Sequence, residues 1–249
     1  MYDVLLGGSH NFAVDRQAAA QATAMVPDLP MVAISNRAFL RRAVRHLVAS
    51  GIRQFIDIGA GIPTVGNTHE VARQADPGCR VAYVDIDPVA VAHAEAILAG
   101  DPAAIAIQGD LRAPGRLLAD PQLREFIDLD RPVGVLLVAV LHLLTDADEP
   151  AGVVAAIRDA IAPGSFIAIS HLTSAQRPED AARLGAHAAQ RTGVPIIFRS
   201  YAQISGFFDG LTVIDPGVVE LPQWRPESPQ DVAEDPGRSL GLAGVGRKD

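Results

Sequence analysis

The stretch Asp57-Ile58-Gly59-Ala60-Gly61-Ile62-Pro63-Thr64 decides the fold class. Residues 53–58 (RQFIDI) are typical of a short buried β-strand, and the pattern predicts a helix that begins near Val65. The two glycines after the strand allow a sharp backbone turn and a close approach to a ligand, because they have no Cβ. The following helix would add free N–H groups and the positive end of its dipole. A dinucleotide-binding loop would have a third glycine where Thr64 stands, so this stretch alone does not identify a ligand.

Strand patterns and helix patterns alternate on both sides of this turn. The other strand-like stretches are residues 80–84, 103–108, 133–140 and 165–170, with residues 239–246 as a last strand. The helix-like stretches are residues 35–50, 87–98, 150–161 and 178–190. Residues 133–140 are apolar throughout, which is typical of a central parallel strand that is covered on both faces. The alternation predicts an α/β fold with a doubly wound, mostly parallel, Rossmann-like sheet.

Two further stretches are expected to lie at the surface. Arg41, Arg42 and Arg45 stand on the polar side of the helix pattern over residues 35–50 and are expected to face solvent. Residues 222–238 are rich in proline and acidic residues and are expected to form a loop.

Charge and composition exclude several classes of protein. The 249-residue chain has 21 basic and 29 acidic side chains and a net charge of −8, so it has no general attraction to nucleic acid or anionic membranes. A single cysteine, Cys79, cannot form a disulfide within the chain. The longest apolar stretch, residues 133–144, is shorter than the roughly 20 residues of a membrane-spanning helix. The N-terminus Met1-Tyr2-Asp3 does not resemble a secretory signal, so we expect a cytoplasmic protein without nucleic-acid or membrane partners.

Two aspartates follow the next two predicted strands at regular spacing. Asp85 comes 24 residues after Gly61, and Asp110 comes 25 residues after Asp85. A carboxylate at the first position can accept both hydroxyls of a ribose. A carboxylate at the second can accept from the amine of an adenine, beside the N–H of Leu111. Because the carboxyl ends of parallel strands meet at one edge of the sheet, the sequence predicts a nucleoside site there, which includes Ile86 beside Asp85.

At these motifs the chain resembles the class I S-adenosylmethionine-dependent methyltransferases. The stretches DIGAGIPT (57–64), YVDIDP (83–88) and QGDLR (108–112) look like the first three motifs of that class. The chain is similar in more detail to a bacterial family known as S-adenosyl methyltransferase. The matching stretches are YDVLLGGSHNFAVDR (2–16), NRAFLRRAVR (36–45), GIPTVGNTHE (61–70) and LLVAVLHLL (136–144). The resemblance implies a seven-stranded sheet whose last strand is antiparallel.

The resemblance also implies a cofactor, S-adenosyl-L-methionine, and residues that hold it. The methionine pocket would be shaped by Asp57, Gly59 and Gly61, the ribose would be held by Asp85, and the adenine by Asp110 with Leu111. The chain departs from nucleic-acid and protein N-methyltransferases, which carry Asn or Asp followed by Pro-Pro-aromatic after the fourth strand. Residues 138–143 read VAVLHL instead, which disfavours a nucleobase or a glutamine amine as the methyl acceptor.

Two histidines are the candidate catalytic residues. His142 follows the predicted fourth strand, where it would lie near the transferred methyl, and His171 ends the predicted fifth strand. An imidazole there could take a proton from a hydroxyl or a carbon acid. Alternatively, each histidine forms local hydrogen bonds only, or the two form one pair that faces the substrate. With one cysteine and no close His/Asp spacing, we expect no metal site.

The N-terminal residues are expected to cover the site. Residues 1–34 form a candidate helical lid, and residues 35–249 form the methyltransferase domain. Within the lid, Tyr2 and Asn11 are expected to touch the cofactor. Arg37 stands at the expected start of a helix, where a cation is unfavourable for the helix dipole. It is therefore expected to bind an anion, either the methionine carboxylate of the cofactor or an acidic substrate, unless it forms a surface salt bridge.

The sequence as a whole predicts a methyltransferase that uses S-adenosyl-L-methionine and transfers the methyl group to an oxygen of a small molecule. One alternative is a protein that binds S-adenosylmethionine or S-adenosylhomocysteine without catalysis. A second alternative is an NAD(P)-dependent oxidoreductase, against which the missing third glycine and the Asp110 motif argue. A homodimer is among the assembly states that the sequence leaves open.

Overall fold

The computed structural model describes residues 1–9, 11–63, 66–192, 195–228, 238 and 240–249. The helices are α1 (Tyr2–Leu5), α2 (Ala13–Met25), α3 (Leu29–Ala49), α4 (Thr68–Ala75), α5 (Pro88–Ile97), α6 (Pro114–Leu118), α7 (Pro121–Phe126), α8 (Pro150–Ala160), α9 (Pro178–Thr192) and α10 (Tyr201–Gly206). The short 3-10 helices are η1 (Leu141–Leu143), η2 (Asp146–Asp148) and η3 (Leu221–Gln223). The strands are β1 (Gln54–Ile58), β2 (Arg80–Asp85), β3 (Ala104–Gln108), β4 (Gly134–Val138), β5 (Phe166–Leu172), β6 (Thr212–Val213), β7 (Val219–Glu220) and β8 (Gly241–Arg247).

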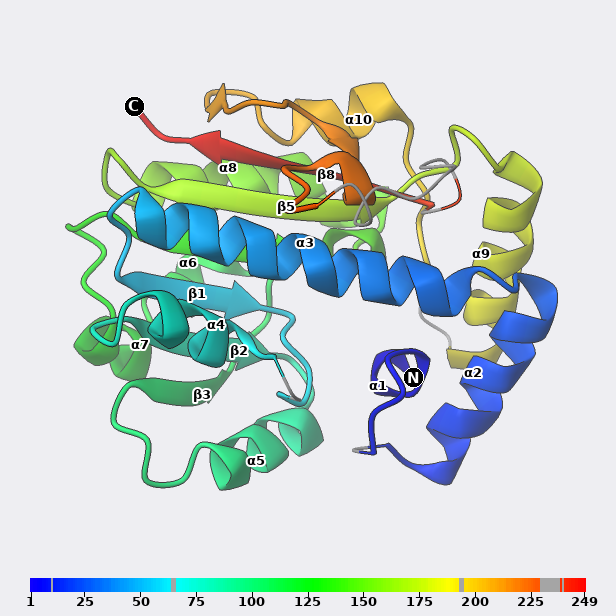
Figure 1. Cartoon of the computed structure of the whole chain (residues 1–249), viewed down its shortest axis with the longest axis horizontal. Coiled ribbons are helices and arrows are strands. Elements are labelled where there is room, and N and C mark those ends of the chain that lie inside the picture. The colour runs from blue at the N-terminus through cyan, green and yellow to red at the C-terminus, as the bar shows by residue number, and fades with distance from the viewer. Residues whose placement is uncertain (10, 64–65, 193–194, 229–237, 239) are drawn as a thin grey trace.

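The strands form one sheet in the order β3-β2-β1-β4-β5-β8-β6, and β7 pairs with β8 (Figure 1). Strands β1 to β5 pair in parallel, and β8 runs antiparallel to β5. The predicted α/β fold with an antiparallel last strand is therefore confirmed. Strands β6 and β7 were not predicted, because two residues are too few to show an alternating pattern.

Helices cover both faces of the sheet, so neighbouring strand residues pack into two different cores. Phe55 belongs to the core under α3, whereas Ile56 belongs to the core on the face of α6 and α8. Figure 1 shows α3 lying across the front of the sheet and α8 behind it. All five residues of β1 are buried, as expected for a strand that is covered on both sides.

Most predicted boundaries agree with the structure within two residues, but two helix starts do not. The helix expected near residue 65 begins at Thr68 as α4, after the capping residue Asn67. The start of α3 is further off. The helix begins at Leu29 and not at residue 35, with Asp28 before it and Pro30 in its first turn, where proline is favourable. Arg37 therefore lies in the interior of α3, and the argument from an arginine at a helix start is wrong. Residues 1–34 are helical over α1, α2 and the first turns of α3. Of the positions expected around the glycine turn and the last strand, Thr64, Val65 and Ser239 lie outside the described residues.

The prediction that Arg42 faces solvent is also wrong, whereas residues 224–228 form a loop as predicted and residues 229–237 lie outside the described residues. Arg42 is buried, with its Nε donating to the carbonyl of Trp224 at 2.7 Å and its Nη2 donating to that of Leu221 at 2.7 Å. Trp224 is itself fully buried and packs edge-to-face on Phe39. The first residues of the stretch expected as a loop are thus part of the core, because their apolar side chains cover α3 and an arginine satisfies their carbonyls.

None of the helices in the described part of the chain is both long and apolar enough to span a lipid bilayer.

Candidate functional site

The glycine turn after β1 is fixed by the end of β2. Gly59 (φ 74°) and Gly61 (φ 62°) adopt the left-handed backbone conformation that favours glycine. The N–H of Gly59 donates to the Val84 carbonyl at 2.8 Å, and that of Gly61 donates to Oδ2 of Asp85 at 2.7 Å. A Cβ on Gly59 would clash with the Val140 side chain, whereas a Cβ on Gly61 would meet no atom within 4 Å. The turn therefore packs against the end of β4 on one side and opens into free space on the other.

Asp57 presents a buried carboxyl below this turn. It is 7% exposed and accepts a hydrogen bond from Oγ1 of Thr68 at 2.6 Å. Burial raises the pKa of Asp57 to about 6, although the Thr68 hydroxyl and the nearby charge of Arg37 both favour the ionised form. The carboxyl thus changes charge close to neutral pH, which is unusual for an aspartate.

Asp85 is oriented by backbone groups on both sides. Besides the N–H of Gly61 on Oδ2, its Oδ1 accepts the N–H of Asp87 at 3.0 Å. Asp87 in turn accepts the N–H of Val89 at 2.9 Å and so caps α5, as the Asp-Pro pair predicted. Each carboxylate oxygen of Asp85 keeps a further lone pair for a ligand. Ile86, the next residue, is 51% exposed beside it.

Asp110 lies at the end of β3 with its carboxylate already paired. Arg112 donates from Nε and Nη2 at 2.9 and 2.7 Å, and these bonds hold the pKa of Asp110 below its usual range. The carboxylate lines a hollow of about 360 Å³ at the ends of β2 and β3. Leu111 beside it is buried. An adenine amine at this position would compete with a surface arginine for the carboxylate.

Tyr2 of α1 and Arg37 of α3 lie together near the carboxyl ends of the strands. The Tyr2 hydroxyl donates to the Ala33 carbonyl at 3.1 Å and accepts from Nδ2 of Asn36 at 2.8 Å. The guanidinium of Arg37 lies over the Tyr2 ring, 5.8 Å from its centroid. Nε of Arg37 is buried and has no hydrogen-bond partner among the described residues. Since its charge also acts on Asp57, Arg37 is a cation placed beside the glycine turn with an unused donor.

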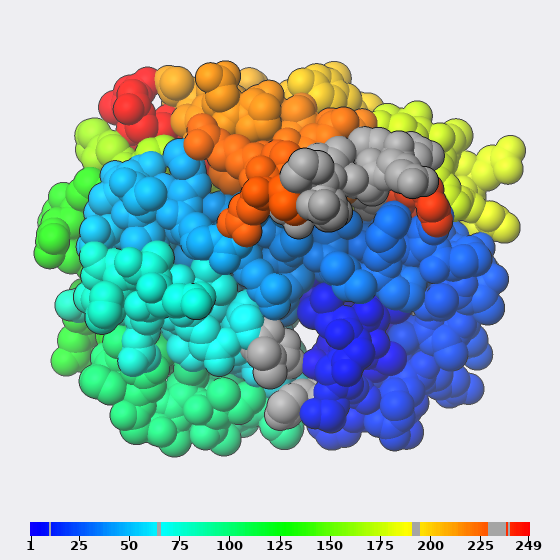
Figure 2. All heavy atoms as spheres, in the orientation of Figure 1, coloured from blue at the N-terminus to red at the C-terminus, as the bar shows by residue number. Residues whose placement is uncertain are grey.

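Asn11 holds the N-terminal segment in shape. Its Nδ2 donates to Oδ2 of Asp3 and to the Gly8 carbonyl, both at 2.8 Å. The neighbouring Phe12 ring contacts His93 of α5 edge-to-face, with centroids 6.1 Å apart. The N-terminal segment, which contacts α3 through Tyr2, therefore also contacts α5 on the opposite side of the site. Figure 2 shows the surface hollowed between the dark blue N-terminal residues and the cyan and green part of the molecule.

The structure brings His142 and His171 together as a buried pair on the other face of the sheet. Their rings pack edge-to-face with centroids 5.9 Å apart. Burial lowers the pKa of His142 to about 3 and that of His171 to about 4, so both are neutral near pH 7. His171 is paired through Nδ1 with the Leu172 carbonyl at 2.7 Å and through Nε2 with Arg199 at 2.9 Å. Nδ1 of His142 is buried without a hydrogen-bond partner in the part of the chain that is described.

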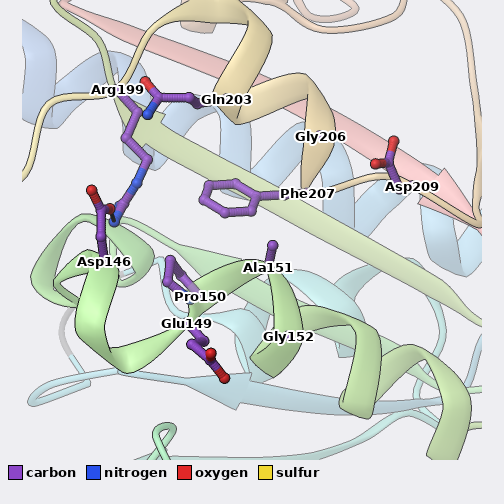
Figure 3. A pocket seen from close by; sticks show the side chains of 10 residues that line it. All are labelled: Asp146, Glu149, Pro150, Ala151, Gly152, Arg199, Gln203, Gly206, Phe207 and Asp209. Carbon is purple, nitrogen blue, oxygen red and sulfur yellow. Dashed lines mark hydrogen bonds and ion pairs between the residues drawn. The ribbon is translucent and has the colours of Figure 1, made fainter.

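Arg199 organises this second cluster, and sequence reasoning missed it. Its guanidinium donates to the carbonyls of Leu141 and Leu144 at 3.1 and 2.9 Å and to Oδ1 of Asp146 at 2.9 Å. Figure 3 shows the side chain reaching Asp146 with the Phe207 ring beside it. A cavity of about 620 Å³ lies here. A single arginine after an apolar stretch has no distinctive sequence signal.

Asn36 and Ser170 were also missed, although Asn36 carried a signal. Ser170 is 2% exposed and its hydroxyl donates to Oδ1 of Asn36, itself 6% exposed, at 2.5 Å. Asn36 stands four residues after Val32 and three before Phe39, both buried on α3. A polar residue in the apolar row of a helix must find a partner, so the pattern itself indicated a buried polar contact.

Known structures resemble this fold over the whole chain. A candidate methyltransferase from Thermobifida fusca YX is 41% identical, with a TM-score of 0.92 over 100% of this chain and 93% of that chain. A DUF574 family protein from Streptomyces avermitilis MA-4680 is 33% identical, with a TM-score of 0.94 over 100% of this chain and 95% of that chain. The N-methyltransferase NodS from Bradyrhizobium japonicum WM9, solved with S-adenosyl-L-homocysteine, shares the fold at 15% identity, with a TM-score of 0.52 over 85% of this chain and 86% of that chain.

No curated protein matches the chain. The family described as S-adenosyl methyltransferase matches it over residues 1–249. With the fold and the glycine turn in place, the chain therefore belongs to the S-adenosyl methyltransferase family.

Proposed function

We propose that the protein binds S-adenosyl-L-methionine and transfers its methyl group to an oxygen of a small-molecule acceptor. The observation that carries the proposal is that an open glycine turn lies near a cation with a donor that lacks a hydrogen-bond partner among the described residues. Gly61 opens into free space, and Nε of Arg37 is buried without a partner in the described residues. A ligand that combines a carboxylate with a nucleoside would use both features.

The residues around the turn fit the methionine part of this cofactor. The turn brings backbone N–H groups close to a ligand, because its glycines leave the approach open. Arg37 would pair with the carboxylate of the methionine part, and the ionised form of Asp57 would attract its ammonium group. Because the pKa of Asp57 is about 6, this attraction weakens as the pH falls below that value.

The ends of β2 and β3 fit the nucleoside part. Asp85 would accept the ribose hydroxyls with the lone pairs that its backbone bonds leave free. Ile86 offers an exposed apolar side chain to a base. Asp110 and the N–H of Leu111 would contact the adenine edge once Arg112 releases the carboxylate.

The N-terminal residues would complete the site. The bound cofactor would supply an electrophilic methyl group on a sulfonium. Methyl transfer is an in-line displacement, so the chain contributes by alignment and by excluding water. We assign residues 1–34 as the lid that does this, since Tyr2 of α1 contacts α3 and Phe12 contacts His93 of α5. Asn11 contributes by holding the shape of this lid.

We assign His142 as the proton acceptor for an acceptor hydroxyl, with His171 as its positioning partner. His142 follows Val140, which packs against Gly59, by two residues, so it lies at the same edge of the sheet as the glycine turn. Burial lowers the pKa of His142 to about 3, so the ring is neutral near pH 7, and its Nδ1 has no partner among the described residues. A hydroxyl becomes a strongly acidic oxonium as its oxygen gains the methyl, so even a weak base takes the proton. His171 is fixed by its bonds to Leu172 and Arg199 and holds the His142 ring from the side.

Turnover of S-adenosyl-L-methionine labelled in its methyl group tests the proposal. The protein is incubated with small molecules grouped as phenols, alcohols, carboxylic acids, amines and thiols, and the products are separated by chromatography. The expected result is S-adenosylhomocysteine together with one labelled oxygen ether or ester. Labelled amines or thioethers would reject the oxygen assignment. Binding of both cofactor forms without a labelled product in any class would favour the non-catalytic alternative.

The role of His142 is tested with the acceptor found in that assay. His142→Gln is expected to lower kcat about 100-fold while the KM for S-adenosyl-L-methionine stays the same. His46→Gln, in the last turn of α3 and outside the proposed site, controls for the loss of an imidazole. Full turnover by His142→Gln would exclude the base role.

A further inference from the structure

A chain of hydrogen bonds runs in one direction from the end of β4 to the N-terminal helix α1. The N–H of Ala139 donates to Oγ of Ser170 at 2.9 Å, and the Ser170 hydroxyl donates to Oδ1 of Asn36 at 2.5 Å. Nδ2 of Asn36 donates to the Tyr2 hydroxyl at 2.8 Å, which donates to the Ala33 carbonyl at 3.1 Å. Since each hydroxyl or amide both accepts and donates, the bonds strengthen one another.

The chain joins parts of the molecule that are far apart in sequence. Asn36 and Ser170 are separated by 134 positions, and both are buried. Burying polar groups costs free energy that their mutual hydrogen bond only offsets, so an apolar pair would pack α3 on β5 at least as well. The polar pair therefore indicates a requirement other than stability at this contact.

The first donor in this chain of hydrogen bonds, the N–H of Ala139, belongs to an unusual backbone bend. Ala139 has φ 59°, in the left-handed region that is unfavourable for residues other than glycine. The next residue, Val140, packs directly against Gly59 of the glycine turn. The bend at Ala139 thus shapes the wall of the open space beside Gly61, called the cleft below. The N–H of Ala139 helps to hold the bend through its bond to Oγ of Ser170 at 2.9 Å and a longer one to the Ser170 carbonyl at 3.3 Å.

We propose that Asn36 and Ser170 are positioning residues that couple the seating of helix α1 through Tyr2 to the bend at Ala139, and so set the affinity of the cleft for the cofactor. The affinity part of this inference rests on the proposed function, whereas the coupling part does not. Neither residue needs to touch a ligand. They act because the seating of α1 and the wall beside Gly59 share one line of hydrogen bonds.

The same pair of strands provides a matched control. The hydroxyl of Ser165 accepts the N–H of Val133 at 3.0 Å, just before the amino end of β4, and Ser165 is fully buried. Ser170 makes the equivalent bond at the carboxyl end of β4. Ser165→Ala and Ser170→Ala thus each remove one buried hydroxyl that binds β4, but only the second lies at the cleft.

Calorimetric titration with S-adenosyl-L-homocysteine tests the affinity. Ser170→Ala and Asn36→Ala are expected to bind about tenfold more weakly than the wild-type protein, which corresponds to loss of one buried hydrogen bond, and Ser165→Ala within about twofold of it. Equal affinities of Ser165→Ala and Ser170→Ala would overturn the proposal.

Amide hydrogen exchange in the ligand-free protein tests the coupling separately, with a variant that leaves the core intact. Tyr2→Phe keeps the ring of Tyr2 and removes only the hydroxyl at the end of the chain of bonds. It is expected to speed exchange at residues 139–144 several-fold and to leave residues 134–136 unchanged. Unchanged exchange at residues 139–144 would overturn the coupling. If the wild-type protein does not bind S-adenosyl-L-homocysteine, the proposed function fails, and the exchange result still decides the coupling.

Discussion

Two clusters of polar side chains lie at the same edge of the sheet, on its opposite faces, and they differ in how far their hydrogen bonds are satisfied. On the α3 face, Arg37 has a buried Nε without a partner among the described residues, and Asp57 holds a carboxyl whose pKa burial raises to about 6. On the α10 face, Arg199 pairs with the carbonyls of Leu141 and Leu144, with His171 and with Asp146. We propose the first cluster as the ligand site, whereas Arg199 in the second already has several partners.

Burial alone therefore does not mark a binding residue. Arg199 is more buried than Arg37, but its donors fix η1 and the loop after it to β5. A buried charge with complete pairing supports the fold, whereas an incompletely paired one beside an open turn favours a ligand. His142 is the exception on the α10 face, since its Nδ1 lacks a partner in the described part of the chain, and this is why it carries the proposed base role.

Removal of Arg199 is the largest expected effect and tests the structural side of the comparison. Arg199→Met is expected to lower the free energy of unfolding by about 3 kcal/mol, because three carbonyl and carboxylate acceptors and His171 lose their donor. Chemical denaturation measures this loss. Molecules that remain folded should bind S-adenosyl-L-homocysteine with wild-type affinity. A variant with full stability and no binding would reverse the assignment of the two clusters.

Removal of Arg37 tests the binding side. Arg37→Met is expected to weaken S-adenosyl-L-homocysteine binding about 10- to 100-fold, because a charge-assisted contact to the carboxylate is lost. The free energy of unfolding should change by less than about 1 kcal/mol, since the guanidinium has an unused donor in the ligand-free protein. Arg45→Met, which removes a surface ion pair with Glu227 from the same helix, is the control and should bind normally. Identical affinities for the two variants would contradict the assignment of Arg37.

Asp57→Asn is expected to change stability and cofactor binding in opposite directions. The folded protein has a raised pKa at Asp57, so the ionised carboxyl destabilises it above pH 6, and protonation relieves this cost as the pH falls. The variant should therefore be more stable than the wild-type protein at pH 8, by about 1 to 2 kcal/mol, with the difference shrinking towards pH 4. Thermal or chemical unfolding across that range measures it. Cofactor affinity should fall in the same variant, and a loss of stability at pH 8 would contradict the account.

The acid sensitivity of the histidine pair is the smallest expected effect. The folded protein has lowered pKa values at His142 and His171, so the unfolded chain binds more protons below pH 6.5 and stability is lost as the pH falls from there towards 4. His171→Gln should remove about 1 kcal/mol of the loss between pH 7.5 and pH 5.5. Unfolding curves at the two pH values measure the difference. An unchanged pH dependence would show that His171 does not stay neutral in the folded protein.

Much of the fold follows from the sequence, because the strands that form the centre of the sheet are covered on both faces and have continuous apolar patterns. The start of α3 was misplaced because Met31, Val32 and Ala33 continue an apolar run across the true helix and mask its beginning at Leu29. Strands β6 and β7 exist only through their pairing with β8, which no local pattern of two residues encodes.

The residues of the candidate site likewise divide into those that the sequence predicts and those that it does not. Asp57, Gly61 and Asp85 come together as predicted, because the spacing of parallel strands fixes where their ends meet. The sequence could not predict which polar side chains have hydrogen-bond partners, because these depend on contacts between distant segments. Ser170 reaches Asn36 across 134 positions, and Arg199 reaches Leu141 across 58. The pairing of Asp110 with Arg112 is local, but the sequence does not decide whether a surface ion pair forms.

Cofactor binding by the wild-type protein is tested by calorimetric titration at pH 7.5 with S-adenosyl-L-homocysteine and, in parallel, with NAD⁺. We expect one saturable site per chain for S-adenosyl-L-homocysteine and no binding of NAD⁺. Binding of NAD⁺ without binding of S-adenosyl-L-homocysteine would contradict it.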